Sequence, residues 1–161
     1  MTIKNQINTL VTALNTWGKT TDSKAEPATD LLHFFSIITR GLSLKPGAVR
    51  LAVMFNGETV RGDIEELGRV DRSILIGISR GRGLTLLGAD ALTRDTGAGD
   101  PLFDLAEQVR DTILGHQFDS QTGEAWPYYK GLKRIEIEGM LIDAYQIEIS
   151  IGTQLPRHDR N

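Results

Sequence analysis

The stretch YYKGLKRIEIEGMLIDAYQIEISIG, from Tyr128 to Gly152, decides the fold class. Apolar side chains recur at every second position of its second half, at Tyr145, Ile147, Ile149 and Ile151. The intervening positions are smaller or more polar: Ala144, Gln146, Glu148 and Ser150. Successive side chains of a strand point to opposite faces, so this alternation predicts a strand with one buried and one wetter face. A turn at Glu138–Gly139 would join it to a preceding strand of the same hairpin.

Two more strands are predicted upstream. AVRLAVMF (48–55) is rich in β-branched residues, and SILIGISR (73–80) is a second strand, expected to run antiparallel to the first. Asn56–Gly57 after the first strand is a turn signal. The charged connection from Glu58 to Asp71 would then project from the body.

Helices are predicted on both sides of these strands. Apolar positions recur at spacings of three and four from Ile3 to Leu14, with Thr2 as a possible N-cap and an end near Asn15. Asp100 and Pro101 suit the start of a helix that Gly115 would end. The run 29–41 fits either a helix or a buried strand by periodicity, and we predict a helix. Residues 16–28 are polar and contain a proline, and we predict a loop that is either functional or a tolerated insertion.

Together these elements predict an α+β fold, with an antiparallel sheet of about four strands and two or three packed helices. The 161 residues are expected to form a single domain, 1–161. Its irregular parts would be the loop at 16–28, the projecting charged connection at 58–71 and a short polar C-terminal tail.

Composition excludes several kinds of chemistry. The chain has no cysteine, which rules out disulfides, zinc–thiolate sites and cysteine nucleophiles. Its formal net charge of −3 does not favour a general nucleic-acid coat, and no apolar run reaches the length of about 20 residues that spans a bilayer. The default expectation is a soluble intracellular protein without a membrane partner.

No motif for catalysis stands out. The three histidines, His33, His116 and His158, have no ligand partner at a metal-binding spacing. GRGLTLLG (81–88) has glycines but lacks the lysine and hydroxyl of a phosphate-binding loop. We therefore predict a protein that is not an enzyme and uses neither a cofactor nor a metal.

The basic residues of the middle of the chain are unusual. Lysine is absent between Pro46 and Tyr129, where every Lys or Arg position is arginine. Arginine tolerates partial burial and forms forked bonds to carboxylates, so it is enriched in protein interfaces. We predict contacts with other subunits or partners through Arg61, Glu65, Glu66, Arg69, Arg72, Arg80 and Arg82. The alternatives are a general preference for arginine and a solvated loop. Phosphate contacts by SRGRG (79–83) are disfavoured by the acidic remainder, so no specific nucleic-acid binding is expected.

The segment from SILIGISRGRGL to SIGTQLP resembles the tail terminator and tail completion proteins of long-tailed bacteriophages. The similarity lies in the entry Pro127, Tyr128 and Gly131, the two-stranded hairpin that follows, and the aromatic Tyr145 of the last strand. The helix from Ile3 to Leu14 fits as well. The long loop at 16–28 and the run 29–41 depart from the simple pattern.

The resemblance implies a structural virion protein that acts by binding. Such proteins form a ring, typically hexameric, that caps the tail tube, stops its elongation and offers a surface to the head connector. The implied partners are further copies of the chain, the tail-tube protein and a head-completion or connector protein. The implied location is the head-proximal end of the tail, after assembly in the host cytoplasm. The alternatives are another head–tail adaptor or tail-tube ring protein, and a small ligand-binding or enzymatic α+β domain.

Overall fold

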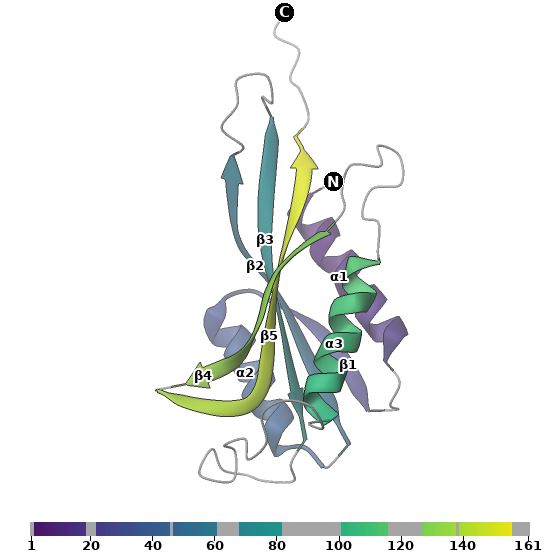
Figure 1. Ribbon diagram of the computed structural model, residues 1–161, viewed down its shortest axis with the longest axis vertical. Helices are drawn as coiled ribbons and strands as arrows, with labels where there is room; N and C mark the ends of the chain where they lie inside the picture. Colours follow the sequence, from purple (N-terminus) through teal and green to yellow (C-terminus); the bar gives the residue numbers. More distant parts are fainter. Residues whose placement is uncertain are drawn as a thin grey trace, which may run out of the picture.

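The fold is described from a computed structural model (Figure 1). The structure describes residues 2–18, 22–45, 47–60, 68–81, 101–115, 127–137 and 139–155. Within them the elements follow in the order α1 (Ile3–Trp17), β1 (Ser23–Ala28), α2 (Leu31–Ser43), β2 (Val49–Val60), β3 (Arg69–Arg80), α3 (Pro101–Leu114), β4 (Pro127–Ile137) and β5 (Met140–Gln154).

The strands form one mixed, five-stranded sheet in the order β1-β2-β3-β5-β4. Strand β1 runs parallel to β2, and all other neighbours are antiparallel. The α+β class is thus confirmed. The prediction of an antiparallel sheet of about four strands is wrong, because the sheet has five strands and one of its strand pairs is parallel. The missing strand is β1, which lies at the edge of the sheet.

Strand β1 occupies the segment that we predicted as a loop. Helix α1 extends to Trp17, and β1 begins at Ser23, so little of 16–28 is left for a loop. The sequence of β1, SKAEPA, carries charges and a proline, which are tolerated in a strand only at an edge. Parallel neighbours require a crossover, and α2 supplies it between β1 and β2. This arrangement confirms the helix predicted at 29–41.

Asn56 and Gly57 do not form the predicted hairpin turn. Strand β2 continues through them with an irregularity: Phe55 pairs with Ile74, but Gly57 pairs with Ser73. Gly57 has a φ of 131°, which suits glycine at a bulge. The two strands therefore extend further than predicted, and Val60 still pairs with Val70. Of the charged connection at 58–71, residues 58–60 belong to β2 and 69–71 to β3, while 61–67 lie outside the described residues.

The helix ends follow local capping chemistry. The hydroxyl of Thr2 accepts a hydrogen bond from the backbone N–H of Asn5 at 3.1 Å, as predicted. The carboxylate of Asp30 accepts one from the N–H of His33 at 2.7 Å and begins α2. Gly115 follows α3, which confirms the third helix.

The closing hairpin forms as predicted, with a bend that was not expected. Ile137 pairs with Met140 across the turn, where Gly139 has a φ of 79°. Between Arg134 and Glu136 the register shifts because β5 contributes more residues than β4. Both strands curve at this point, as Figure 1 shows at the lower left. The bend brings the end of the hairpin into the core beneath α2.

Two hydrophobic cores lie on opposite faces of the sheet. Helices α1 and α3 cover one face, where the predicted row of Tyr145, Ile147, Ile149 and Ile151 is buried. Helix α2 covers the other face and contributes Phe34, Ile37, Ile38 and Leu42 to the core there. The rest of this core consists of Ala28, Ala52, Met54, Leu75, Ile135, Ile142 and Ala144. Because α2 buries Ala144 here, only Gln146 and Glu148 of the second row remain partly exposed near the middle of β5.

Gly77 sets how closely α2 approaches the sheet. A Cβ added there would lie 2.7 Å from both Ile38 Cδ1 and Phe34 Cζ. We expect Gly77→Ala to lower the free energy of unfolding by about 1–3 kcal/mol, because buried side chains would have to move. Urea denaturation followed by circular dichroism measures the change. The control is Gly131→Ala, where nothing lies within 4 Å of the added atom. Equal stabilities of the two variants would contradict the close packing.

Candidate assembly surfaces

The predicted contact residues do not form one cluster in the described structure. Arg61, Glu65, Glu66 and Arg82 lie outside the described residues. Arg69 and Arg72 lie near the start of β3, and Arg80 lies at its other end. The described arginines therefore belong to separate parts of the sheet.

Arg72 is part of a buried polar network. Its side chain is 6% exposed, and its Nε donates to Glu58 Oε1 at 3.0 Å. A second guanidinium nitrogen donates to Gln6 Oε1 at 3.0 Å, and Gln6 Nε2 donates to Thr153 Oγ1 at 2.8 Å. The network joins α1, β2, β3 and β5 at the end of the sheet where β2 and β3 extend beyond the helices (Figure 1).

The network holds the extended strand ends in place. Gln6 is fully buried, so its amide would be costly to leave without partners. Arg72 is thus engaged within its own subunit, and a change there would alter folding as well as any contact. Arg69 is more exposed and donates to Gln154 Oε1 at 3.3 Å, which makes it the more suitable residue for testing a contact.

Arg80 also has an internal partner. Its guanidinium donates to Asp143 Oδ2 at 3.1 Å, and the Asp143 side chain is fully buried. A buried carboxylate is stable only when paired and hydrogen-bonded. The side chain of Arg80 remains 23% exposed, so one part of it faces solvent while it neutralises Asp143.

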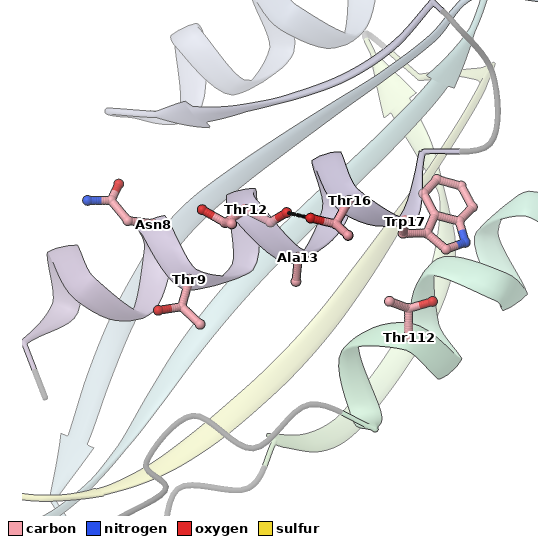
Figure 2. Close-up of a pocket in the computed structure, with 7 residues that line it drawn as sticks. All are labelled: Asn8, Thr9, Thr12, Ala13, Thr16, Trp17 and Thr112. Atoms are coloured by element: carbon pink, nitrogen blue, oxygen red, sulfur yellow. Dashed lines mark hydrogen bonds between the residues drawn. The ribbon is translucent and has the colours of Figure 1, made fainter.

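A groove with a volume of about 610 Å³ lies between α1 and α3 (Figure 2). Among the described residues the lining carries no charged side chain; it consists of Asn8, Thr9, Thr12, Ala13, Thr16, Trp17 and Thr112. Over its whole length α1 contains a single charged residue, Lys4. Such a scarcity of charge is unusual, because exposed helix faces commonly carry charges. It was a signal for the groove that our sequence-based prediction missed.

A pair of exposed leucines lies on the other face of the sheet. Leu31 is 51% and Leu32 is 82% exposed, at the start of α2. The helix is buried through Phe34, Ile37 and Ile38, whereas Leu31 and Leu32 in its first turn are not part of that core. Neighbouring exposed apolar side chains often mark an interaction site.

The β1 edge of the sheet is blocked. The Asn15 side chain donates to the carbonyl of Ala25 at 3.2 Å and accepts from its N–H at 2.8 Å, in place of a neighbouring strand. Pro27, two residues on, has no N–H to offer. Lys24 and Glu26 form an ion pair at 2.9 Å, which holds the pKa of Glu26 below its ordinary value. Capped groups, proline and charges all oppose the addition of another strand.

The β4 edge has a different character. Tyr128 and Tyr129 are 54% and 41% exposed. The guanidinium of Arg110 lies 5.5 Å from the centre of the Tyr129 ring, within cation–π range. A hydrogen bond to Asp111 raises the pKa of Arg110, which therefore stays charged. A register shift between Tyr129 and Gly131 interrupts the strand and limits how regularly another strand could pair.

The described residues offer no cluster of metal ligands. No group of three or more His, Asp or Glu side chains in them could hold a metal ion. The His33 ring accepts a hydrogen bond from the N–H of Thr29 at 3.1 Å, which suits a structural role at the start of α2. His116 and His158 lie outside the described residues. No helix in the described part is long and apolar enough to cross a membrane.

No model of a known family and no curated protein matches the chain. The function must therefore be inferred from its own surfaces.

We predict that Arg72→Met lowers the free energy of unfolding by about 2–3 kcal/mol, because the buried Gln6 amide and Glu58 lose a charged donor. Chemical denaturation measures the loss. Arg69→Met is the matched control and should stay within about 0.5 kcal/mol of the original protein, since Arg69 is more exposed. Similar losses in both variants would show that the network does not hold the strand ends.

We predict that Asn15→Ala destabilises the protein by about 1–2 kcal/mol and promotes aggregation, because it removes two hydrogen bonds and opens the β1 edge. Thermal denaturation and light scattering measure the two effects. Asn5→Ala is the control, because it makes the same side-chain change at an exposed position of α1 and leaves the two hydrogen bonds from Asn15 to β1 in place. An Asn15→Ala protein as stable and monodisperse as the control would contradict the edge cap.

Proposed function

We propose that this protein is a structural subunit of a bacteriophage tail that assembles into a ring and terminates the tail tube. The observation that carries the proposal is a pair of unlike surfaces on opposite faces of one sheet, neither of which has a charged side chain among its described residues. The α1–α3 groove lies on one face, and the exposed Leu31 and Leu32 lie on the other.

Unlike surfaces on opposite faces suit head-to-tail association. A subunit that binds its neighbour through two different patches forms a ring when the rotation closes, and a filament when it does not. Uncharged surfaces suit the centre of such an interface, where charged residues are depleted. This arrangement supports head-to-tail association of identical subunits, and the resemblance to tail terminator proteins implies that it closes into a ring, typically a hexamer.

The extended ends of β2 and β3 supply a second contact region. The buried Arg72 network fixes these ends to α1 and β5. Val60, at the end of β2, is 71% exposed. We assign Arg61, Glu65, Glu66 and Arg69 to contact with a neighbouring subunit or the tube. Arg80, at the other end of β3, and Arg82 remain candidate contact residues.

The proposed mechanism is binding without catalysis. A ring that matches the end of the tail tube would occupy the surface on which the next tube subunit adds. Its free face would then receive the head-completion or connector protein. The protein would lie at the head-proximal end of the tail and need no cofactor.

A second candidate function comes from the groove itself. Its volume of about 610 Å³ falls within the range of small-molecule sites. A small ligand-binding α+β domain would use this groove in a monomer. Another head–tail adaptor or tail-tube ring protein would instead share the ring and differ in its partner.

The native mass of the purified protein tests the proposal. We expect a discrete species of about six times the subunit mass of 17.8 kDa in native mass spectrometry, and rings in negative-stain images. The measurement covers a series of protein and salt concentrations, because contacts between exposed charges weaken with salt whereas apolar ones do not. A monomer at every concentration would overturn the ring and favour the ligand-binding domain.

A further inference from the structure

We infer that Leu31 and Leu32 of one copy seat in the α1–α3 groove of the next copy. The inference rests on the proposed ring and names the contact that builds it. The occupant of the groove is thus a second copy of this chain, presented by the first turn of its α2.

The groove suits an apolar occupant because two of its four threonine hydroxyls, those of Thr16 and Thr112, already have partners in their own helices. Thr16 Oγ1 donates to the carbonyl of Thr12 at 2.9 Å, as the dashed line in Figure 2 shows. Thr112 Oγ1 donates to the carbonyl of Gln108 at 2.8 Å. A hydroxyl that is satisfied within its own helix can be covered without leaving a donor unpaired. The threonine methyl groups, Ala13 and the partly buried Trp17 ring then supply an apolar lining.

Local hydrogen bonds hold the backbone that presents the two leucines. Asp30 caps the helix through the N–H of His33, and the His33 ring accepts from the N–H of Thr29. These bonds fix the backbone on both sides of Leu31 and Leu32. A group that is fixed before association loses little conformational entropy on binding.

The other exposed apolar side chains suit the groove less well. Tyr129 contacts Arg110, and Tyr128 beside it lies along the β4 edge. Val60 is a single side chain at a strand end. Among the exposed large apolar residues of the described structure, the leucines are the pair that projects from the end of a helix. The leucines and the groove of one subunit lie on opposite faces of the sheet and cannot contact each other. The leucines must therefore bind the groove of another copy.

Cysteine cross-linking tests the contact directly, because the chain has no cysteine of its own. We would prepare Leu32→Cys, Thr12→Cys and Lys24→Cys separately, mix them in pairs, and treat each mixture with a short bismaleimide. We expect a covalent dimer from Leu32→Cys with Thr12→Cys. We expect none from either variant alone, or from Lys24→Cys on β1 with Leu32→Cys. The protein carrying both Leu32→Cys and Thr12→Cys should give a ladder of oligomers that ends at the ring size.

A charge in the contact gives a second test. Leu32→Asp should weaken association at least about tenfold, because it places a carboxylate against a groove whose described lining has no charged partner for it. Thr12→Lys combined with Leu32→Asp should restore much of the loss through an ion pair. Lys24→Asp on the β1 edge is the control and should leave association unchanged, because Lys24 belongs neither to the groove lining nor to the leucine pair. Circular dichroism checks that each variant folds, as expected for exposed positions.

The outcomes separate this inference from the proposed function. Rings that persist in Leu32→Asp, or that give no Leu32–Thr12 cross-link, would overturn the contact and leave the ring in place. Cross-links between two Leu32→Cys chains would indicate a symmetric dimer and overturn the head-to-tail contact. A protein that is monomeric throughout, with no cross-link, would overturn both.

Discussion

The fold depends on β3, a strand that must be covered on both faces at once. Its side chains alternate between the core beneath α1 and α3 and the core beneath α2. Gly77 leaves the space that lets Phe34 and Ile38 of α2 reach the sheet. With β2 and β5 paired along its length on either side, the middle of β3 has no exposed surface left. Contacts with partners must therefore use the ends, edges and helix surfaces of the molecule.

These remaining surfaces differ in how open they are. Asn15 and Pro27 prevent another strand from pairing with the β1 edge. At one end of β3, the polar groups of Arg72, Glu58 and Gln6 are hydrogen-bonded to one another. The β4 edge, the α1–α3 groove and the start of α2 stay available. Of the described residues, those that line the groove and the leucine pair carry no charge. Water is displaced more readily from such surfaces than from charged ones, so they suit the centre of an interface.

The sequence predicted the elements whose patterns are regular and local. The row from Tyr145 to Ile151, the helix after Pro101 and the turn at Gly139 followed from alternation, capping and glycine chemistry. Strand β1 was missed because its edge position permits Lys24, Glu26 and Pro27, which are unfavourable in most strands. The bulge at Gly57 was missed because a glycine with positive φ serves a bulge as well as a turn.

The site was harder to predict than the fold, for a physical reason. The arginine pattern indicated residues able to form ion pairs, but sequence cannot say whether the partner lies in the same subunit. Arg72 and Arg80 found theirs in Glu58 and Asp143. The groove had a visible signal in the near absence of charge along α1, yet its second wall comes from α3, nearly 100 residues later.

The chemistry of the groove also bears on the two candidate functions. A small-molecule site usually directs a few polar groups inward to orient its ligand. Here the hydroxyls of Thr16 and Thr112 are turned to carbonyls of their own helices. Asn8 and Thr12 are exposed to solvent, so they lie at the rim. A surface with this arrangement distinguishes shape and apolar character more than functional groups. It therefore favours a protein side chain as its occupant over a polar metabolite.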